Sequence, residues 1–224
     1  MKLFLDTANL EEIREIKKWG VLGGLTSSPS LIAREKPGDI ETYMKELCAE
    51  VDGPVSLETT AEKADEIFEQ GLKLSQVAPN AVVKVAMTPD GLEAGRRLVE
   101  RDIPVNVTLT FSPAQAILAA EIGATYVSPF LGRIDDAAAD GMHVLREICE
   151  IYEVQGYDTL VLAASLRHPM HVVEAAMCGA DISTMPYDVM KKLVKHPLTD
   201  KGVESFTKDW QALQEELKQG KKGA

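Results

Sequence analysis

Residues 80–88 read NAVVKVAMT, an apolar and β-branched run with one lysine, Lys84, near its middle. A proline, Pro79, precedes the run and the turn-forming sequence TPDG at 88–91 closes it, so the pattern predicts a buried β-strand. A charged amine inside such a strand is unfavourable unless a carboxylate pairs with it or it has lost its proton. The remainder of the sequence must therefore explain Lys84.

Seven more short apolar runs occur along the chain, and amphipathic segments separate them. The eight runs cover residues 2–6, 24–28, 54–59, 81–87, 103–110, 125–130, 159–165 and 181–186. The helical patterns cover 10–19, 39–51, 61–77, 92–101, 113–122, 138–154, 168–178 and 189–194. Strands that alternate with helices pair in parallel through right-handed crossovers. Eight such units in 224 residues predict an α/β fold, a single (β/α)8 TIM barrel. The alternative, an open doubly wound sheet, usually has fewer strands, and no Gly-x-Gly-x-x-Gly follows the first run.

The C-terminal region predicts an additional helix. We expect the barrel to occupy residues 1–198, a helix to occupy 199–219, and a flexible tail to occupy 220–224. The helix carries one apolar stripe, composed of Phe206, Trp210, Leu213 and Leu217. The residues leave two interpretations open, because the stripe can pack on its own barrel or on a neighbouring subunit.

The composition excludes several classes of partner. The net charge of -11 argues against binding to a nucleic-acid backbone or an anionic membrane. No apolar stretch approaches the roughly 20 residues that span a bilayer. An acid, Asp6, stands where a signal peptide would have its apolar core, and three cysteines lack metal-like spacing. These features predict a cytoplasmic protein with neither nucleic-acid nor membrane partners.

Polar residues recur late in the apolar runs. In a barrel of this class, the C-terminal ends of the strands face the active site and inward side chains alternate. The polar residues at this level are Asp6, Thr26, Ser28, Glu58, Lys84, Asn106, Thr108, Ser128, Ser165 and Arg167. Their convergence from different strands predicts one site around Lys84.

Lys84 has a chemical use in such a site. Burial favours the neutral form of an amine, which attacks a ketone to form a Schiff base. The iminium is then an electron sink for cleavage of the adjacent carbon–carbon bond. Asp6 and Glu58 are the available proton carriers, and Thr108 can hold a water between them. The alternative interpretation is a structural ion pair of Lys84 with Glu58 or Asp6.

Two arginines, Arg133 and Arg167, follow the sixth and seventh runs. Their guanidinium groups, together with the hydroxyl of Ser165, predict an anion clamp suited to phosphate. The alternative is that each is a solvated surface arginine. His168 and His171 have a spacing that can hold a metal, but no acid or cysteine nearby completes a ligand set. We therefore predict surface histidines at a helix start and no metal site.

Six motifs together resemble one known family. They are FLDTANLEEI at 4–13, PNAVVKVAMTPDG at 79–91, VNVTLTFSPAQA at 105–116, GATYVSPFLGRIDD at 123–136, LAASLRHPMHV at 162–172 and HPLTDKGVESFTKDW at 196–210. The sequence resembles the short-chain transaldolases, the group that also contains fructose-6-phosphate aldolase. The resemblance extends over about residues 1–212.

The resemblance implies a class I mechanism without a metal or an organic cofactor. By position, Lys84 would form the Schiff base with a ketose. Asp6 would remove the proton from the C4 hydroxyl as the C3–C4 bond breaks. Glu58, with Thr108, would position the catalytic water.

The resemblance also implies the binding residues and the assembly. Asn106 and Ser128 would hold hydroxyls of the retained dihydroxyacetone unit, and Arg133, Ser165 and Arg167 would bind the distal phosphate. Family members form homo-oligomers, as rings of five or two such rings. Their terminal helix packs between neighbours, which favours the subunit-interface interpretation for residues 199–219.

The sequence departs from the family at three places near the pocket. TSSPS at 26–30 puts Ser28 where the family has a substrate-binding asparagine, Ala86 replaces a proline, and SLET at 56–59 places Leu57 and Thr59 beside Glu58. An amide has a longer reach than a hydroxyl and offers both a donor and an acceptor. An altered ketose specificity is therefore an open hypothesis.

Two residues distinguish transfer from simple cleavage. Phe130 stands where the aldolases carry a tyrosine that helps water to release dihydroxyacetone, and Asn106 also matches the transaldolases. We therefore expect a transaldolase of the pentose phosphate pathway. It would move dihydroxyacetone from a ketose phosphate, such as fructose 6-phosphate or sedoheptulose 7-phosphate, to an aldose phosphate. The alternatives are an aldolase or transaldolase with altered ketose specificity, for example for a sulfonated fructose, and a non-catalytic sugar-phosphate-binding barrel.

Overall fold

A computed structural model describes residues 1–220 and shows eight parallel strands that close into a barrel in chain order. The strands are β1 (Lys2–Asp6), β2 (Leu22–Thr26), β3 (Val55–Glu58), β4 (Ala81–Ala86), β5 (Val105–Thr110), β6 (Tyr126–Pro129), β7 (Leu160–Ala163) and β8 (Ile182–Met185). Pairing of β1 with β8 closes the sheet. The predicted (β/α)8 barrel is therefore confirmed.

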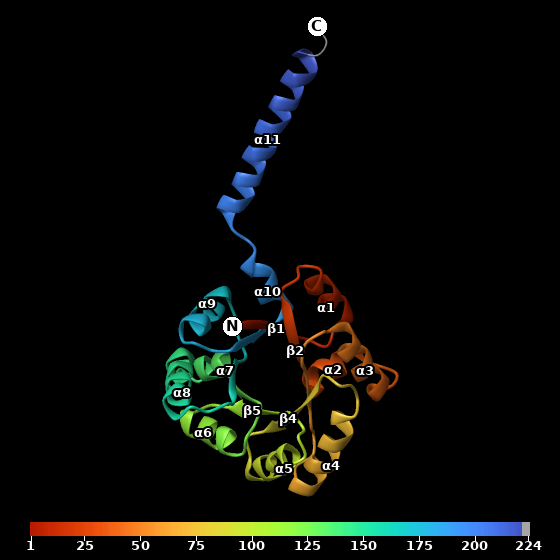
Figure 1. Ribbon diagram of the computed structural model, residues 1–224, viewed down its shortest axis with the longest axis vertical. Coiled ribbons are helices and arrows are strands. Elements are labelled where there is room, and N and C mark those ends of the chain that lie inside the picture. The colour runs from red at the N-terminus through yellow and green to blue at the C-terminus, as the bar shows by residue number, and fades with distance from the viewer. Residues whose placement is uncertain (221–224) are drawn as a thin grey trace. The chain divides into compact units, whose positions relative to one another are not determined.

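The helices lie outside the strands. They are α1 (Leu10–Lys17), α2 (Pro29–Glu35), α3 (Ile40–Glu50), α4 (Ala64–Ser75), α5 (Pro89–Val99), α6 (Pro113–Glu121), α7 (Leu131–Asp136), α8 (Gly141–Gln155), α9 (Pro169–Met177), α10 (Tyr187–Leu193) and α11 (Pro197–Gly220). Figure 1 shows helices α1 to α9 as an outer ring around the strands. The short helices α2 and α7 were not predicted, and each follows a strand directly.

A repeated start signal fixes where several strands end. Helices α2, α5, α6 and α9 each begin with a proline preceded by a capping residue. The capping residues are Ser28, Thr88, Ser112 and His168, whose side chains each accept a backbone N–H of the first turn. Proline suits the first helical position because its missing N–H would have no partner there. This signal ends β2 at Thr26, two residues before the predicted end of that run.

Apolar side chains fill part of the barrel interior. Side chains from five strands meet there, namely Phe4, Val82, Tyr126, Leu162, Ala164 and Ile182. Strands as distant as β4 and β8 can meet in this way only across the barrel interior. Side chains alternate between the two faces of a strand, and Val82 faces the interior. Lys84, two residues later in β4, therefore also points inward, whereas Val83 and Val85 face the helices. The register places Glu58 and Asn106 beside Lys84.

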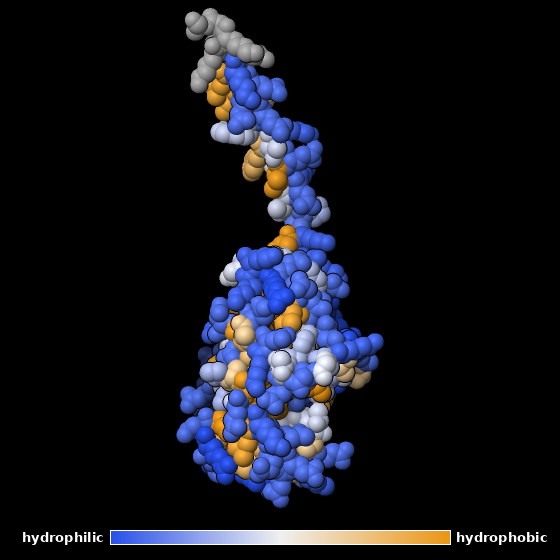
Figure 2. Space-filling view, turned by 90° about the vertical axis from the view of Figure 1, so that its right-hand side faces the viewer, coloured by the Kyte–Doolittle hydropathy of each residue, from blue (hydrophilic) through white to orange (hydrophobic). Residues whose placement is uncertain are grey.

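The chain divides into two compact units, residues 1–190 and 191–224. In the second unit, α11 is a single helix with exposed apolar side chains at Val203, Phe206, Trp210, Leu213 and Leu217. Figure 2 shows apolar residues among hydrophilic ones along this helix. Gly220, predicted as the start of the tail, ends α11, and residues 221–224 lie outside the described part of the chain. None of the helices in residues 1–220 has the length and apolarity that crossing a membrane requires.

Candidate active site

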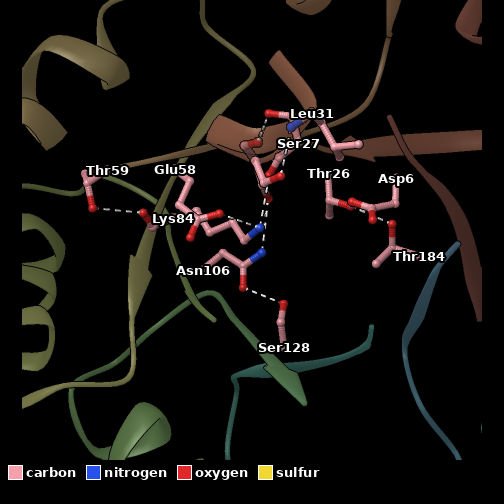
Figure 3. A network of polar contacts seen from close by, with 12 residues as sticks. Asp6, Thr26, Ser27, Leu31, Glu58, Thr59, Lys84, Asn106, Ser128 and Thr184 are labelled. Carbon is pink, nitrogen blue, oxygen red and sulfur yellow. Dashed lines mark hydrogen bonds and ion pairs between the residues drawn. The ribbon is translucent and has the colours of Figure 1, made fainter. Parts of the chain in front are cut away.

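Lys84 lies in the middle of β4 and is 4% exposed. Its Nζ is 3.0 Å from Glu58 Oε2 and donates to the backbone carbonyl of Ser27 at 3.0 Å. Figure 3 shows this contact, with Asn106 beside it. The ion pair with Glu58 that the sequence allowed is therefore present. It does not enclose the amine, because Lys84 also borders a cavity.

This cavity opens to solvent at the C-terminal end of the strands, and its space amounts to about 440 Å³ when the part open to solvent is included. Its lining consists of Asp6, Thr26, Lys84, Ser128, Phe130, Arg133, Ala164, Ser165 and Thr184. Seven of these nine residues are predicted site residues, and they come from strands or loops that are distant in sequence. A lysine, a carboxylate and an arginine thus face one space.

Asp6, at the end of β1, is the carboxylate of this cavity. Thr26 Oγ1 donates to Asp6 Oδ1 at 2.7 Å and lies 2.7 Å from Thr184 Oγ1. Burial raises the pKa of Asp6 above its ordinary value of 3.8, whereas Lys84, Thr26 and Arg133 act in the opposite direction. A carboxyl with a raised pKa is a stronger base once it is ionised.

A second group of hydrogen bonds fixes the amide of Asn106. Its Nδ2 donates to Ser56 Oγ at 3.1 Å, and Ser128 Oγ donates to its Oδ1 at 2.7 Å. All three residues are buried. The orientation of the amide is therefore set before any ligand binds. The sequence analysis did not predict Ser56, which contacts Asn106, or Thr184, which contacts Thr26. Both lie in predicted strands at the level of the site.

Thr108 is placed beside a distortion of β5. The residue after it, Leu109, has a φ of 57°, and the pairing register with β6 shifts between Val107 and Thr110. Within the described residues, the hydroxyls of Thr108 and Thr110 are buried and have no hydrogen-bond partner. A buried hydroxyl without a partner is unfavourable, and a water or ligand atom would satisfy it. The Thr108 hydroxyl is therefore available to a water.

The two predicted clamp arginines differ in their surroundings. Arg133, on α7, borders the cavity, and its guanidinium carbon is 5.0 Å from the ring centre of Phe130. Arg167 instead forms a two-pronged ion pair with Asp136, at 3.1 and 2.5 Å, and does not line the cavity. The structure thus brings Arg133 and Ser165 to the cavity and leaves Arg167 outside its lining.

Ser28 is another predicted residue outside the cavity lining, as are Glu58, Asn106 and Thr108. Its hydroxyl accepts the N–H of Leu31 at 3.3 Å and caps α2. In this arrangement the side chain stabilises the helix start. Sequence reasoning placed Ser28 in the strand and so missed the cap that Ser28 and Pro29 form.

The prediction of two surface histidines is wrong for His171, which is buried. It shares the inner face of α9 with Val172 and Ala175, and its Nε2 lies 3.2 Å from Asp135 Oδ2. His168 is exposed and caps α9. Among residues 1–220, no cluster of three or more His, Cys, Asp or Glu side chains can hold a metal ion.

The fold and the site define a (β/α)8-barrel protein with a lysine-centred polar cavity at the C-terminal face of the sheet. Comparison with known proteins gives the family. A model described as "Transaldolase/Fructose-6-phosphate aldolase" matches residues 3–217, so the chain belongs to this family.

Curated relatives agree with this assignment, and solved structures agree with the fold. A probable transaldolase from Thermodesulfovibrio yellowstonii is 51% identical over 95% of this chain and 99% of its own length. A probable transaldolase from Aquifex aeolicus is 51% identical over 96% of this chain and 99% of its own length. Among solved structures, a thiamine phosphate pyrophosphorylase from Pyrococcus furiosus has a TM-score of 0.57 at 17% identity and covers 86% of this chain and 93% of its own. At that identity the likeness shows the fold alone.

Proposed function

We propose that this chain is a transaldolase that transfers a dihydroxyacetone unit from a ketose phosphate to an aldose phosphate through a Schiff base on Lys84. One observation carries the proposal. The Lys84 amine is buried inside the barrel, contacts the Glu58 carboxylate at 3.0 Å, and faces a cavity that Asp6 also lines. Membership of the family supports the reaction class.

The first steps follow from these contacts. The Glu58 carboxylate takes a proton from Nζ, and the neutral amine attacks C2 of the ketose. Loss of water from the resulting carbinolamine gives the iminium. Glu58 and the unpartnered hydroxyl of Thr108 hold this water, which also serves for hydrolysis in the reverse direction.

Cleavage of the C3–C4 bond requires a base at the C4 hydroxyl. Asp6 has this role, because burial raises its pKa and Thr26 orients its Oδ1. The electrons of the broken bond enter the iminium and leave an enamine on Lys84, while the aldose departs. The enamine then attacks the carbonyl carbon of an acceptor aldose, and Asp6 returns its proton to the new hydroxyl.

The remaining residues bind the sugar. Asn106 and Ser128 hold hydroxyls of the three-carbon unit, in the orientation that their mutual hydrogen bond sets. Arg133, Ser165 and Arg167 bind the distal phosphate of donors such as fructose 6-phosphate or sedoheptulose 7-phosphate. No step needs a metal or an organic cofactor.

Trapping the Schiff base tests the proposal. Borohydride added with saturating fructose 6-phosphate should reduce the iminium and attach a stable three-carbon mass to the peptide that contains Lys84. An unmodified Lys84 peptide under these conditions would refute the mechanism. Lys84→Met should fold and show no carbon exchange with glyceraldehyde 3-phosphate as acceptor.

Phe130 is the observation that separates transfer from free cleavage. Its ring lines the cavity without a hydroxyl, so it cannot activate a water to release dihydroxyacetone. We expect little free dihydroxyacetone when the acceptor is omitted. Accumulation of dihydroxyacetone without acceptor would instead favour an aldolase.

Ser28 supports a second candidate, a transaldolase with altered ketose specificity. Because its hydroxyl caps α2, it does not replace the asparagine that the family uses to bind substrate hydroxyls. A different ketose with an anionic head, such as a sulfonated fructose, would still use the arginine clamp. A panel of ketose phosphates and a sulfonated ketose, assayed by product mass, distinguishes the two.

We also propose that the protein forms homo-oligomers, pentamers or decamers, through α11. The exposed apolar stripe of this helix, including Phe206 and Trp210, is suited to burial against another copy. Light scattering should give a mass of five or ten subunits, and Trp210→Glu should lower it. A monomeric mass for the unaltered chain would contradict this. The cytoplasmic location stays a prediction.

A further inference from the structure

We propose that His171 is a positioning residue for the anion-binding edge of the cavity, because it locks the backbone of Arg167 to helix α7. The inference rests on the proposed function in one respect, that the anion is the distal group of the sugar. The proposal is based on the two contacts of the His171 imidazole, on the carboxylates of Asp135 and Asp136 in α7, and on Gly132, which has no room for a side chain.

The imidazole of His171 joins two segments of the chain. Its Nδ1 accepts the backbone N–H of Arg167 at 3.3 Å, and its Nε2 is 3.2 Å from Asp135 Oδ2. A backbone N–H can only donate, and an ionised carboxylate can only accept. The neutral tautomer with its proton on Nε2 is therefore the one form that satisfies both partners.

The carboxylates that hold Arg167 come from the end of α7. Asp135 accepts the N–H of Gly141 at 2.9 Å, which ties it to the start of α8. The next residue, Asp136, holds the guanidinium of Arg167 with two contacts. The backbone of Arg167, through His171, and its side chain, directly, are thus attached to the helix that carries Arg133.

The start of α7 also contacts the loop between β7 and α9, which carries Ser165 and Arg167. The N–H of Gly132 donates to the carbonyl of Ser165 at 3.1 Å. A Cβ at Gly132 would lie 2.3 Å from that carbonyl oxygen and 2.6 Å from Arg167 Nε, so only glycine fits without a shift. Ser165 has a φ of 59°, a left-handed conformation that a serine keeps only when surrounding contacts impose it.

These contacts have one consequence for ligand binding. Ser165 and Arg133 line the cavity, and Arg167 follows Ser165 by two residues in the same loop. The loop can hold the Ser165 hydroxyl beside Arg133, facing an anion in the cavity, only if it keeps its distance from α7. Gly132 fixes this distance at Ser165, and His171 fixes it at the backbone of Arg167.

Protonation of His171 would break the link. A proton on Nδ1 would face the N–H of Arg167, and two donors repel. Burial lowers the pKa of His171 below its ordinary value of 6.5, and His168 acts in the same direction. Asp135 and Glu174 oppose the shift, and Arg167 adds to it. The neutral form therefore holds the loop at neutral pH, and anion affinity should fall as the pH falls through this lowered pKa.

Two substitutions separate the two contacts. His171→Asn keeps an acceptor at the position of Nδ1, and His171→Gln keeps a donor at the position of Nε2 but loses that acceptor. His143→Gln, at an exposed histidine of α8, is the matched control. A neutral hydrogen bond is worth a factor of about 3 to 10 in affinity. We expect His171→Gln to raise KM for fructose 6-phosphate by about this factor with little change in kcat. With unphosphorylated fructose as donor, all variants should match the parent.

The pH profile provides a readout that a purely structural role would not change. We expect the parent to lose affinity for fructose 6-phosphate on the acid side, and His171→Asn, which has no titrating ring, to lose less. The second ionisation of the phosphate near pH 6 affects every variant alike, so the ratio of their KM values isolates the imidazole. A ratio that stays constant with pH would overturn the proposal.

A second probe keeps the inference apart from the reaction. Inorganic phosphate can be titrated calorimetrically into the parent and variants, with no turnover required. Weaker binding to His171→Gln than to the parent and His171→Asn supports the positioning role, even if no carbon exchange occurs and the proposed function fails. Equal binding to all three overturns it. If His171→Gln does not fold, ¹⁵N spectra of the parent decide, because a proton on Nδ1 at neutral pH would contradict the assigned tautomer.

Discussion

Removing one partner of the Lys84–Glu58 ion pair should destabilise the protein more than removing both. The two side chains are only 6% and 16% exposed, and the charged atoms are 3.0 Å apart. A buried charge that loses its partner typically costs about 3–5 kcal/mol, whereas replacing the whole pair by neutral groups is often close to neutral. Lys84→Met leaves the carboxylate without its cation, so we expect a loss of about 3 kcal/mol in the free energy of unfolding.

The other two variants complete a double-mutant cycle. In Glu58→Gln the amide oxygen still accepts from Nζ, so we expect a smaller loss of about 2 kcal/mol. In Lys84→Met with Glu58→Gln no charge remains buried, and what is lost is the hydrogen bond to the carbonyl of Ser27, about 1 kcal/mol. The coupling energy between the two positions is then about 4 kcal/mol, well above the roughly 0.5 kcal/mol by which independent sites deviate from additivity.

Urea unfolding at pH 7.5, followed by far-ultraviolet circular dichroism, measures all four corners of the cycle. A protein of this size loses about 2–4 °C in Tm per kcal/mol, so Lys84→Met should melt about 6–12 °C below the parent. Additive losses would refute the reasoning, because they would mean that the two groups do not interact across 3.0 Å. The double variant should be nearly as stable as the parent and have no exchange activity, which separates folding from chemistry.

Three further outcomes follow from hydroxyls near the cavity. Thr26→Val removes a hydrogen bond that lowers the pKa of Asp6, so this pKa should rise further. Because Asp6 acts as a base only when it is ionised, the acid limb of the kcat/KM profile should move to higher pH. An acid limb that does not move would exclude Asp6 as the base. Thr108→Val should lower kcat by about 10- to 100-fold, whereas Thr110→Val, at the other buried hydroxyl without a partner, should leave kcat unchanged and stabilise the fold by about 1 kcal/mol. Equal kcat values for the two variants would remove the water-holding role of Thr108. Ser28→Ala removes the cap of α2, so it should lower the free energy of unfolding by about 1 kcal/mol and leave KM for the donor unchanged. A raised KM would show instead that Ser28 binds the sugar.

The barrel could be predicted because strand and helix patterns alternate eight times in the sequence. The errors lie at junctions. β2 ends at Thr26 because Ser28 and Pro29 start a helix there, a signal that outweighs the apolar run. Helices α2 and α7 are 7 and 6 residues long, too short for a 3.6-residue period to be visible.

The centre of the site could be predicted for a similar reason. Inward positions alternate along each strand, so polar residues near the strand ends pointed to Lys84, Glu58 and Asn106. The contacts among residues from different strands could not be predicted, since they depend on the pairing register of the strands and on how the barrel closes. Ser56 reaches Asn106 across the intervening strand, 50 positions along the chain. The contact of His171 with Asp135 likewise depends on α7, a helix that was not predicted.

Gly132 restricts how this pocket can be redesigned. Even a single methyl group at this position would collide with the main-chain oxygen of Ser165, so a library that varies residue 132 would mainly return misfolded clones. Efforts to change which sugar the enzyme accepts would do better at Phe130, which lines the cavity and where the surrounding backbone does not depend on a missing side chain.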